Sequence, residues 1–318
     1  MNSKRWTLLG LFLIVLGLAG MAYQRFDFGE KLPAYQQKWT FGEGELENLH
    51  IEGEYDVDVE FIDSPDGAGY IEASGNMKQE AIDKIKAAAI SGQTLKLEFE
   101  EPWDWSFFSM NFQSTKQHIT VALAKDSGLK AISYKSVDGN GSFAGLKAEN
   151  IELSVSSGNI RADAVQAETL KFTATTGNIT AERVEVQGNA EIKLGSGNIK
   201  INELQGALTA KATSGNITAS GVEGPVEASL GSGNIKFTDF TGNGKFKSTS
   251  GNITLENQRS DSLDIAVQSG SVKLSIDPQF RGVYDLRTKS GSITAPESPQ
   301  QSEDVVKVRT TSGDIRIR

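Results

Sequence analysis

The four residues Ser-Gly-Asn-Ile recur along this chain, at 157–160, 196–199, 214–217, 232–235 and 250–253. Thr-Gly-Asn-Ile occupies 176–179, and the looser copies SGSV, SGSI and SGDI end at Val272, Ile293 and Ile315. The glycines of these phrases follow one another at intervals of 18 to 22 residues. A period this regular is typical of a protein built from stacked structural repeats.

Each repeat also carries apolar residues at fixed distances from its glycine. Ile or Val stands two positions after it, and mostly apolar residues stand five and seven positions before it. This alternation is typical of strands with one buried face. Gly and Asn both accept positive φ at low cost, so each Gly-Asn pair is expected to reverse the chain.

Two arrangements fit this pattern. The Gly-Asn pairs could close the hairpins of an antiparallel meander, or they could form one corner of a coil whose parallel rungs stack about 4.8 Å apart. We favour the coil, because stacking explains why equivalent positions are identical. The predicted turn ladder consists of Gly158, Asn159, Gly177, Asn178, Gly197, Asn198, Gly215, Asn216, Gly233, Asn234, Gly251 and Asn252.

The position three residues after the glycine alternates between a cation and Thr through nine repeats. In a stack of consecutive rungs, like charges would then lie about 9.6 Å apart, where salt screens most of their repulsion. The cations form a predicted stripe that could bind a polyanion, although a row of Lys and Thr is also common on solvated strands. Its members are Arg161, Lys200, Lys236, Lys273 and Arg316.

The N-terminal residues indicate membrane attachment. Residues 7–24 are apolar and uncharged, follow Lys4 and Arg5, and precede Asp27 and Glu30, so we expect a single transmembrane anchor with the remainder outside the cytoplasm. The alternative is a signal peptide whose cleavage would release a secreted protein. The predicted divisions are a cytoplasmic stub (1–6), the anchor (7–24), a juxtamembrane linker (25–35), a capping segment (36–128) and the repeat domain (129–318).

Residues 36–128 differ in pattern and predict a small α+β segment. A helix is expected to begin at the N-cap Asn76 and to end near Gly92, with Ile82, Ile85 and Ala89 on one face. The stretch PWDWSFFSMNF between two predicted strands either packs on the first rung or exposes an aromatic tip to a membrane interface or a partner. The tip residues are Trp103, Trp105, Phe107, Phe108 and Phe112.

Composition offers little catalytic machinery. The chain has no Cys, which excludes disulfides and thiolate chemistry, and its two histidines, His50 and His118, have no ligand spacing. Asp163 and Glu182 stand at equivalent positions of neighbouring repeats and are the best candidate carboxylate pair. The formal net charge of −9 argues against nucleic acid as a partner. We expect no enzyme activity, no cofactor and no metal site.

The Ser-Gly-Asn-Ile repeats, following one apolar N-terminal segment, resemble the bacterial β-strand-repeat family called "putative adhesins", which includes LiaG-type envelope-stress proteins of Gram-positive bacteria. The resemblance covers about 130–318. The predicted fold is therefore all-β, a β-solenoid of about ten rungs of 18–22 residues, preceded by an α+β cap and a transmembrane helix. The resemblance implies a membrane-anchored binding or scaffolding protein in envelope stress, or else an adhesin. Its partners would be another envelope protein, a membrane-active peptide or a wall polymer.

Overall fold

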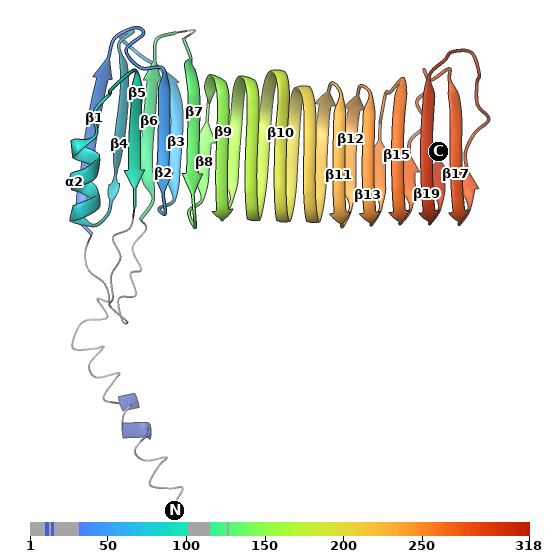
Figure 1. The fold of residues 1–318 in the computed structure, drawn as a ribbon, viewed down its shortest axis with the longest axis horizontal. Coiled ribbons are helices and arrows are strands. Elements are labelled where there is room, and N and C mark those ends of the chain that lie inside the picture. The colour runs from blue at the N-terminus through green and yellow to red at the C-terminus, as the bar shows by residue number, and fades with distance from the viewer. Residues whose placement is uncertain (1–9, 13, 16–31, 101–114, 126) are drawn as a thin grey trace, which may run out of the picture.

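The chain forms a long rod of stacked strands (Figure 1). The structure is a computed structural model that describes residues 10–12, 14–15, 32–100, 115–125 and 127–318. Twenty strands are assigned in this part of the chain, together with the helix α2 (Gln79–Ala87), and residues 10–12 and 14–15 are also helical.

The strands of the N-terminal third are β1 (Ala34–Phe41), β2 (Asn48–Gly53), β3 (Val57–Asp63), β4 (Gly69–Asn76), β5 (Thr94–Phe99), β6 (Gln117–Leu123), β7 (Leu129–Ser136), β8 (Gly141–Ala144) and β9 (Lys147–Ser157). The rest of the rod consists of β10 (Ile160–Glu223), which winds through several turns, then β11 (Val226–Ser232), β12 (Ile235–Thr241), β13 (Gly244–Ser250), β14 (Ile253–Glu256), β15 (Ser262–Ser269), β16 (Val272–Leu274), β17 (Val283–Ser290), β18 (Ile293–Thr294), β19 (Val305–Ser312) and β20 (Ile315–Ile317).

Successive repeats pair in parallel and in register. Leu208 lies beside Val226, which lies beside Gly244, and Ile217 lies beside Ile235 in the same way. Each turn of the coil, here called a rung, therefore places one strand before its Gly-Asn corner and one after it. We call the two resulting surfaces face A (strands before the corner) and face B (strands after it). The prediction of stacked parallel strands is confirmed, and the antiparallel meander is wrong.

The core lies between the two faces. The apolar positions two residues after and five and seven residues before each glycine point inward and are buried in almost every rung. At the position seven residues before the corner glycine, one rung has Gly244 in place of an apolar side chain. Three phenylalanines fill the space beside it. Phe237 contacts Phe246 and Phe240 edge-on, with ring centroids 5.1 and 6.0 Å apart, respectively. Burying each such ring contributes about 1.5–3 kcal/mol to folding.

The rungs begin before the predicted boundary at residue 129. β2 pairs in parallel with β7 on face A, and β3 pairs with β8 on face B. β5 and β6 form a further rung outside β2 and β3. The antiparallel strands β4 and β1 then extend face B, so part of the segment predicted as a separate cap is built as rungs.

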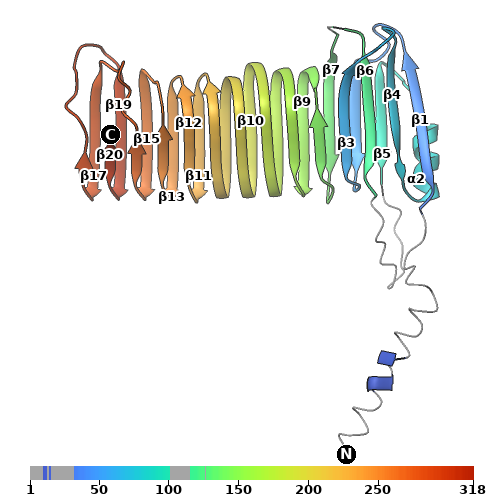
Figure 2. The same ribbon diagram turned by 180° about the vertical axis from the view of Figure 1, so that it is seen from behind.

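Helix α2 lies at this end of the rod (Figure 2). Its Ala81, Ile82 and Ile85 are buried, and the Trp39 indole donates a hydrogen bond to the Ala88 carbonyl at 2.7 Å. The predicted ends of the helix are wrong. Asn76 instead closes β4 and donates its side-chain amide to the Leu32 carbonyl at 3.1 Å.

The C-terminal end of the predicted helix is displaced as well. The helix stops at Ala87, Ala89 is exposed, and Gly92 and Gln93 (φ 56° and 61°) form the turn that enters β5. Gly92 is suited to that tight turn because it adopts positive φ without strain.

The last two rungs do not stack in chain order. β15 pairs with β19, and β17 pairs with the other side of β19. On face B, β20 likewise lies between β16 and β18. The final repeat is therefore inserted one place in from the end, and the rung formed by β17 and β18 is outermost (Figure 1). Stacking in simple chain order would instead have placed the last repeat at the end of the rod.

The membrane prediction falls mostly on residues that the structure does not describe. Most of 7–24, and the aromatic tip at 103–112, lie outside the described residues. Among the described residues, no helix combines the length and the apolar composition that crossing a bilayer requires.

Candidate functional site

The Gly-Asn corner uses its two residues for different purposes. The glycines have φ between 121° and 145° from Gly158 to Gly270, whereas no Asn of the ladder has positive φ. A Cβ on Gly215 would lie 1.6 Å from the Gly197 carbonyl oxygen. The expectation that Asn shares the positive φ is wrong: glycine alone makes the turn, and it also lets adjacent rungs approach.

The asparagines form a continuous hydrogen-bonded ladder along the rod. The Oδ1 atom of each accepts from the next rung's Asn, through its backbone N–H, its Nδ2, or both. Asp56 begins the ladder by accepting from Asn140 at 2.7 Å. Ser271, Asp314 and Ser292 continue it in spatial order at the other end. The hydrogen-bonding groups of these side chains are paired with one another, so the corner has a structural role.

The predicted cationic stripe lies on face B but is largely neutralised. Arg161 pairs with Glu182 at 3.1 Å, Lys236 with Glu256 at 2.8 Å, and Arg316 with Asp314 at 3.0 Å. Lys200 and Lys273 have no ion pair with any described residue. The strict alternation also fails in space, because the inserted last rung places Arg316 beside Lys273.

The candidate carboxylate pair is not assembled as a catalytic dyad. Arg183 binds Asp163 at 2.5 Å, while Glu182 binds Arg161, so each carboxylate is held by its own guanidinium. His50 lies 2.5 Å from the Ser133 hydroxyl, and His118 is on another strand. No group of three His, Asp or Glu residues in the described chain is arranged to hold a metal ion.

A second corner of the coil, six residues after each glycine, is strained. Ala164, Arg183, Glu203, Asp239 and Asn257 all have φ between 50° and 56°, which costs about 1 kcal/mol or more for a residue other than Gly. Gly145 and Gly221 occupy the same column. The recurrence of Gly, Asp and Asn at this position is the sequence signal that could have revealed the corner.

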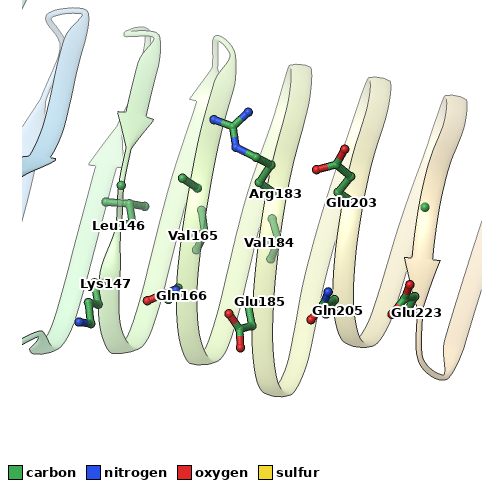
Figure 3. Close-up of a pocket in the computed structure, with 13 residues that line it drawn as sticks. Leu146, Lys147, Val165, Gln166, Arg183, Val184, Glu185, Glu203, Gln205 and Glu223 are labelled. Carbon is green, nitrogen blue, oxygen red and sulfur yellow. The ribbon is translucent and has the colours of Figure 1, made fainter. Parts of the chain in front are cut away.

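A groove of about 650 Å³ runs along this second corner (Figure 3). It crosses successive rungs, and a row of long polar side chains lines it two residues beyond the strained position: Lys147, Gln166, Glu185, Gln205 and Glu223. The buried Leu146, Val165 and Val184 lie between the strained positions and this row.

The groove is acidic. Glu185, Glu203 and Glu223 are exposed and make no ion pair with any described residue. Two cations also line the groove: Arg183, whose charge is engaged by Asp163, and Lys147, which lies at one end. Three carboxylates without an ion pair in the described chain and two amides along one groove can accept hydrogen bonds from a cationic ligand.

Comparison with known proteins identifies the repeats. The family model described as Toastrack DUF4097 matches residues 46–236 and 225–318. No match is found among curated proteins.

The solved structures that match this chain are remote in sequence. A putative adhesin from Bacteroides fragilis has 19% identity and a TM-score of 0.44, over 74% of this chain and 97% of that one. A putative lipid binding protein from Parabacteroides distasonis has 16% identity and a TM-score of 0.46, over 88% and 97%. A putative adhesin from Parabacteroides merdae has 13% identity and a TM-score of 0.32, over 89% and 96%. At these values the likenesses carry no conclusion about what this chain binds.

Proposed function

This chain belongs to the Toastrack family, and we propose that it acts by binding or scaffolding at the cell envelope, held there by residues 7–24 with residues 25–318 outside the cytoplasm. The observation that carries the proposal is the acidic groove along the second corner. A rigid coil holds Glu185 and Glu223 in one row and Glu203 at the strained corner beside them. None of the three has an ion pair within the described chain, and the lysine of the row, Lys147, lies at one end of it.

The partner we propose for this groove is a cationic, membrane-active peptide. A peptide with basic groups on one side could lie along the row and meet one carboxylate after another. Electrostatic contacts of this kind raise association rates and weaken as salt rises.

The test is binding of a short amphipathic Lys-rich peptide to the full chain in an uncharged detergent. The triple variant E185Q/E203Q/E223Q should bind about tenfold more weakly, since each exposed charge contributes about 0.5 kcal/mol. The matched control, E43Q/E297Q/E303Q, changes the net charge equally at exposed sites outside the groove. An equal loss in the control would mean that only net charge matters, and it would sink the groove as a site.

The membrane location is tested separately. Protease treatment of intact cells should degrade residues 25–318, and in untreated cells the protein should sediment with the membranes after lysis. Recovery of a shortened form in the medium would instead support the secreted alternative. A part in envelope stress rests on the LiaG resemblance, and it predicts that cells lacking the protein respond differently to a wall-active cationic peptide. Identical responses would remove that part of the proposal.

An adhesin or wall-polymer binder is the second candidate, favoured only by Lys200 and Lys273, the two stripe cations without an ion pair in the described chain. Substituting both by Gln should weaken binding to an anionic polymer if the stripe is the contact. Unchanged binding would retire the stripe on face B.

A further inference from the structure

A second groove, of about 750 Å³, lies on face A near the C-terminal end of the rod. It crosses the rungs of β13, β15, β19 and β17, and it is separate from the acidic groove. Its lining contains Lys247, Arg287, Lys289 and Arg309 together with several hydroxyls, and no carboxylate and no aromatic ring.

The register of the strands explains the hollow. Lys247 of β13 lies beside Ala266 of β15, which lies beside Arg309 of β19, which lies beside Arg287 of β17. A methyl group therefore stands between long cationic side chains, so Ala266 forms a floor and its neighbours form walls. The groove lies where the last repeat is inserted between β15 and β17.

The neighbouring side chains that line the groove, from Lys247 across Ala266 to Arg309 and Arg287, carry an excess of positive charge. The side chains two residues earlier in the same strands are balanced in charge. There, acids and bases alternate in space: Glu227, Lys245, Asp264, Lys307 and Asp285. In the groove, Asp285 alone binds both Arg287 (3.1 Å) and Arg309 (3.2 Å), while Lys247 and Lys289 have no ion pair with any described residue. Like charges on neighbouring strands destabilise a sheet, so stability does not account for this excess of cations.

Polar side chains stand beside the cations on the outer surface. Thr249, Gln268 and Thr311 are exposed and line the groove, two residues further along their strands than Lys247, Ala266 and Arg309. Their hydroxyl and amide groups add hydrogen-bond donors for ligand oxygens.

We propose that this groove binds a linear polymer of phosphodiester-linked polyol units. Ammonium, guanidinium and hydroxyl groups are donors suited to phosphate oxygens. From Lys247 to Arg287 the groove spans three rung spacings, roughly 14 Å, which is longer than one phosphate and suits a chain of repeated anionic groups. The absence of aromatic rings from the lining leaves nothing on which nucleic-acid bases would stack.

The experiment is calorimetric titration of the full chain, in an uncharged detergent, with a glycerol-phosphate oligomer at low and at physiological salt. The K247Q/K289Q variant should bind at least tenfold more weakly and with less salt dependence, and both lysines are exposed and free of ion pairs within the described chain, so folding should be preserved. K125Q/K135Q, with the same change of charge at exposed sites outside both the groove and the stripe, should bind within twofold of the parent chain. Equal losses in the two variants would overturn the proposal.

A further variant separates binding from folding. T249V/T311V removes two exposed hydroxyls from the groove and keeps β-branched side chains on the strands, so folding should be preserved, while oligomer binding should fall about threefold or more. Unchanged affinity in T249V/T311V would contradict the role of these hydroxyls as ligand donors. Tighter binding of anionic-lipid vesicles, or of duplex DNA, than of the oligomer would overturn the choice of a polyol phosphate chain.

Discussion

Within the recurring Ser-Gly-Asn-Ile phrase, glycine and asparagine solve different problems. Gly215 turns the chain at φ 121° and leaves no side chain where the neighbouring carbonyl passes. Asn216 has negative φ and instead joins its rung to the previous one through Asn198 at 3.0 Å. The identity of each residue therefore follows from contacts between rungs, which is why the phrase recurs at every corner.

Substituting Gly215 by Ala should destabilise the protein by about 4 kcal/mol or more, because the new Cβ would meet backbone that cannot move away. Gly221 is the matched control. Its φ is 63°, its nearest neighbour would lie 3.6 Å from a Cβ, and other residues occupy its column in other rungs. G221A should cost only about 1 kcal/mol. Urea denaturation of both variants measures the difference, and equal losses would contradict close stacking at the Gly-Asn corner.

Substituting Asn198 by Ala removes two hydrogen bonds of the ladder. In one, the Asn198 Nδ2 donates to the Asn178 Oδ1, and in the other, the Asn198 Oδ1 accepts from the Asn216 Nδ2. At about 0.5–1 kcal/mol for each exposed bond, the loss should be about 1–2 kcal/mol. Asn243 is also exposed, and N243A should change stability by less than about 0.5 kcal/mol. If the two variants unfold at the same urea concentration, the ladder contributes nothing to stability.

Asp314 occupies a place in the ladder that Asn holds in most rungs. Hydrogen bonds from the Ser292 backbone N–H and hydroxyl hold the pKa of the Asp314 carboxyl below its usual range, with help from Arg316. Because the folded pKa is depressed, this stabilisation is present above the ordinary pKa of 3.8 and is lost as the pH falls through the lower, folded value.

The Ser292 amide resonance should therefore titrate with a midpoint below pH 3.8 in an NMR experiment, and it should not titrate in D314N. A midpoint at or above that pH in the parent chain would show that the contact with Ser292 is absent.

At the scale of the strands, the sequence predicted which side chains are buried and that neighbouring strands run parallel. It did not predict the order in which the last rungs stack. The Ile/Val column was expected to be buried throughout, yet Ile293 is 45% exposed because its rung is outermost. Every rung presents nearly the same edge to its neighbours, so the repeat pattern fits either order. The loops that connect the last rungs determine their order. The longer intervals of 21 and 22 residues between the corner glycines around Gly291 were the sequence signal that these loops differ.

The sequence also located the core of the rod but not its grooves. A groove depends on which side chains stand beside one another across rungs, as Ala266 does between Lys247 and Arg309. That neighbourhood exists only once the rung order is known. The acidic groove was missed for a different reason, because the signal at the second corner is weak. Gly, Asp or Asn stands there in four of the seven rungs with positive φ, and Ala, Arg or Glu stands there in the other three.

The order of the last rungs predicts their protection from hydrogen exchange. β19 has neighbours on both sides, whereas β17 pairs only with β19 on face A. Amides of 306–311 should therefore exchange more slowly than those of 284–289, although they lie closer to the chain terminus. Faster exchange in 306–311 would indicate that the last repeat is outermost, as simple chain order would have it.

For the whole molecule, stacking turns a short phrase into a rod with two oppositely charged grooves, one acidic along its second corner and one cationic near its C-terminal end. Neither groove is built by a single repeat. Each needs several rungs held in register, so the proposed binding depends on the coil as a unit and should be lost when rungs separate.

The most direct test of the coil uses paired cysteines in this chain, which has none of its own. Thr218 and Lys236 are in-register neighbours on face B, while Ser229 and Thr238 lie on opposite faces of the rod and would meet only if residues 229–238 formed a hairpin. Treated with a short thiol cross-linker, T218C/K236C should cross-link rapidly and S229C/T238C should not. Rapid cross-linking of S229C/T238C, with none in T218C/K236C, would contradict the stacked coil on which both grooves depend.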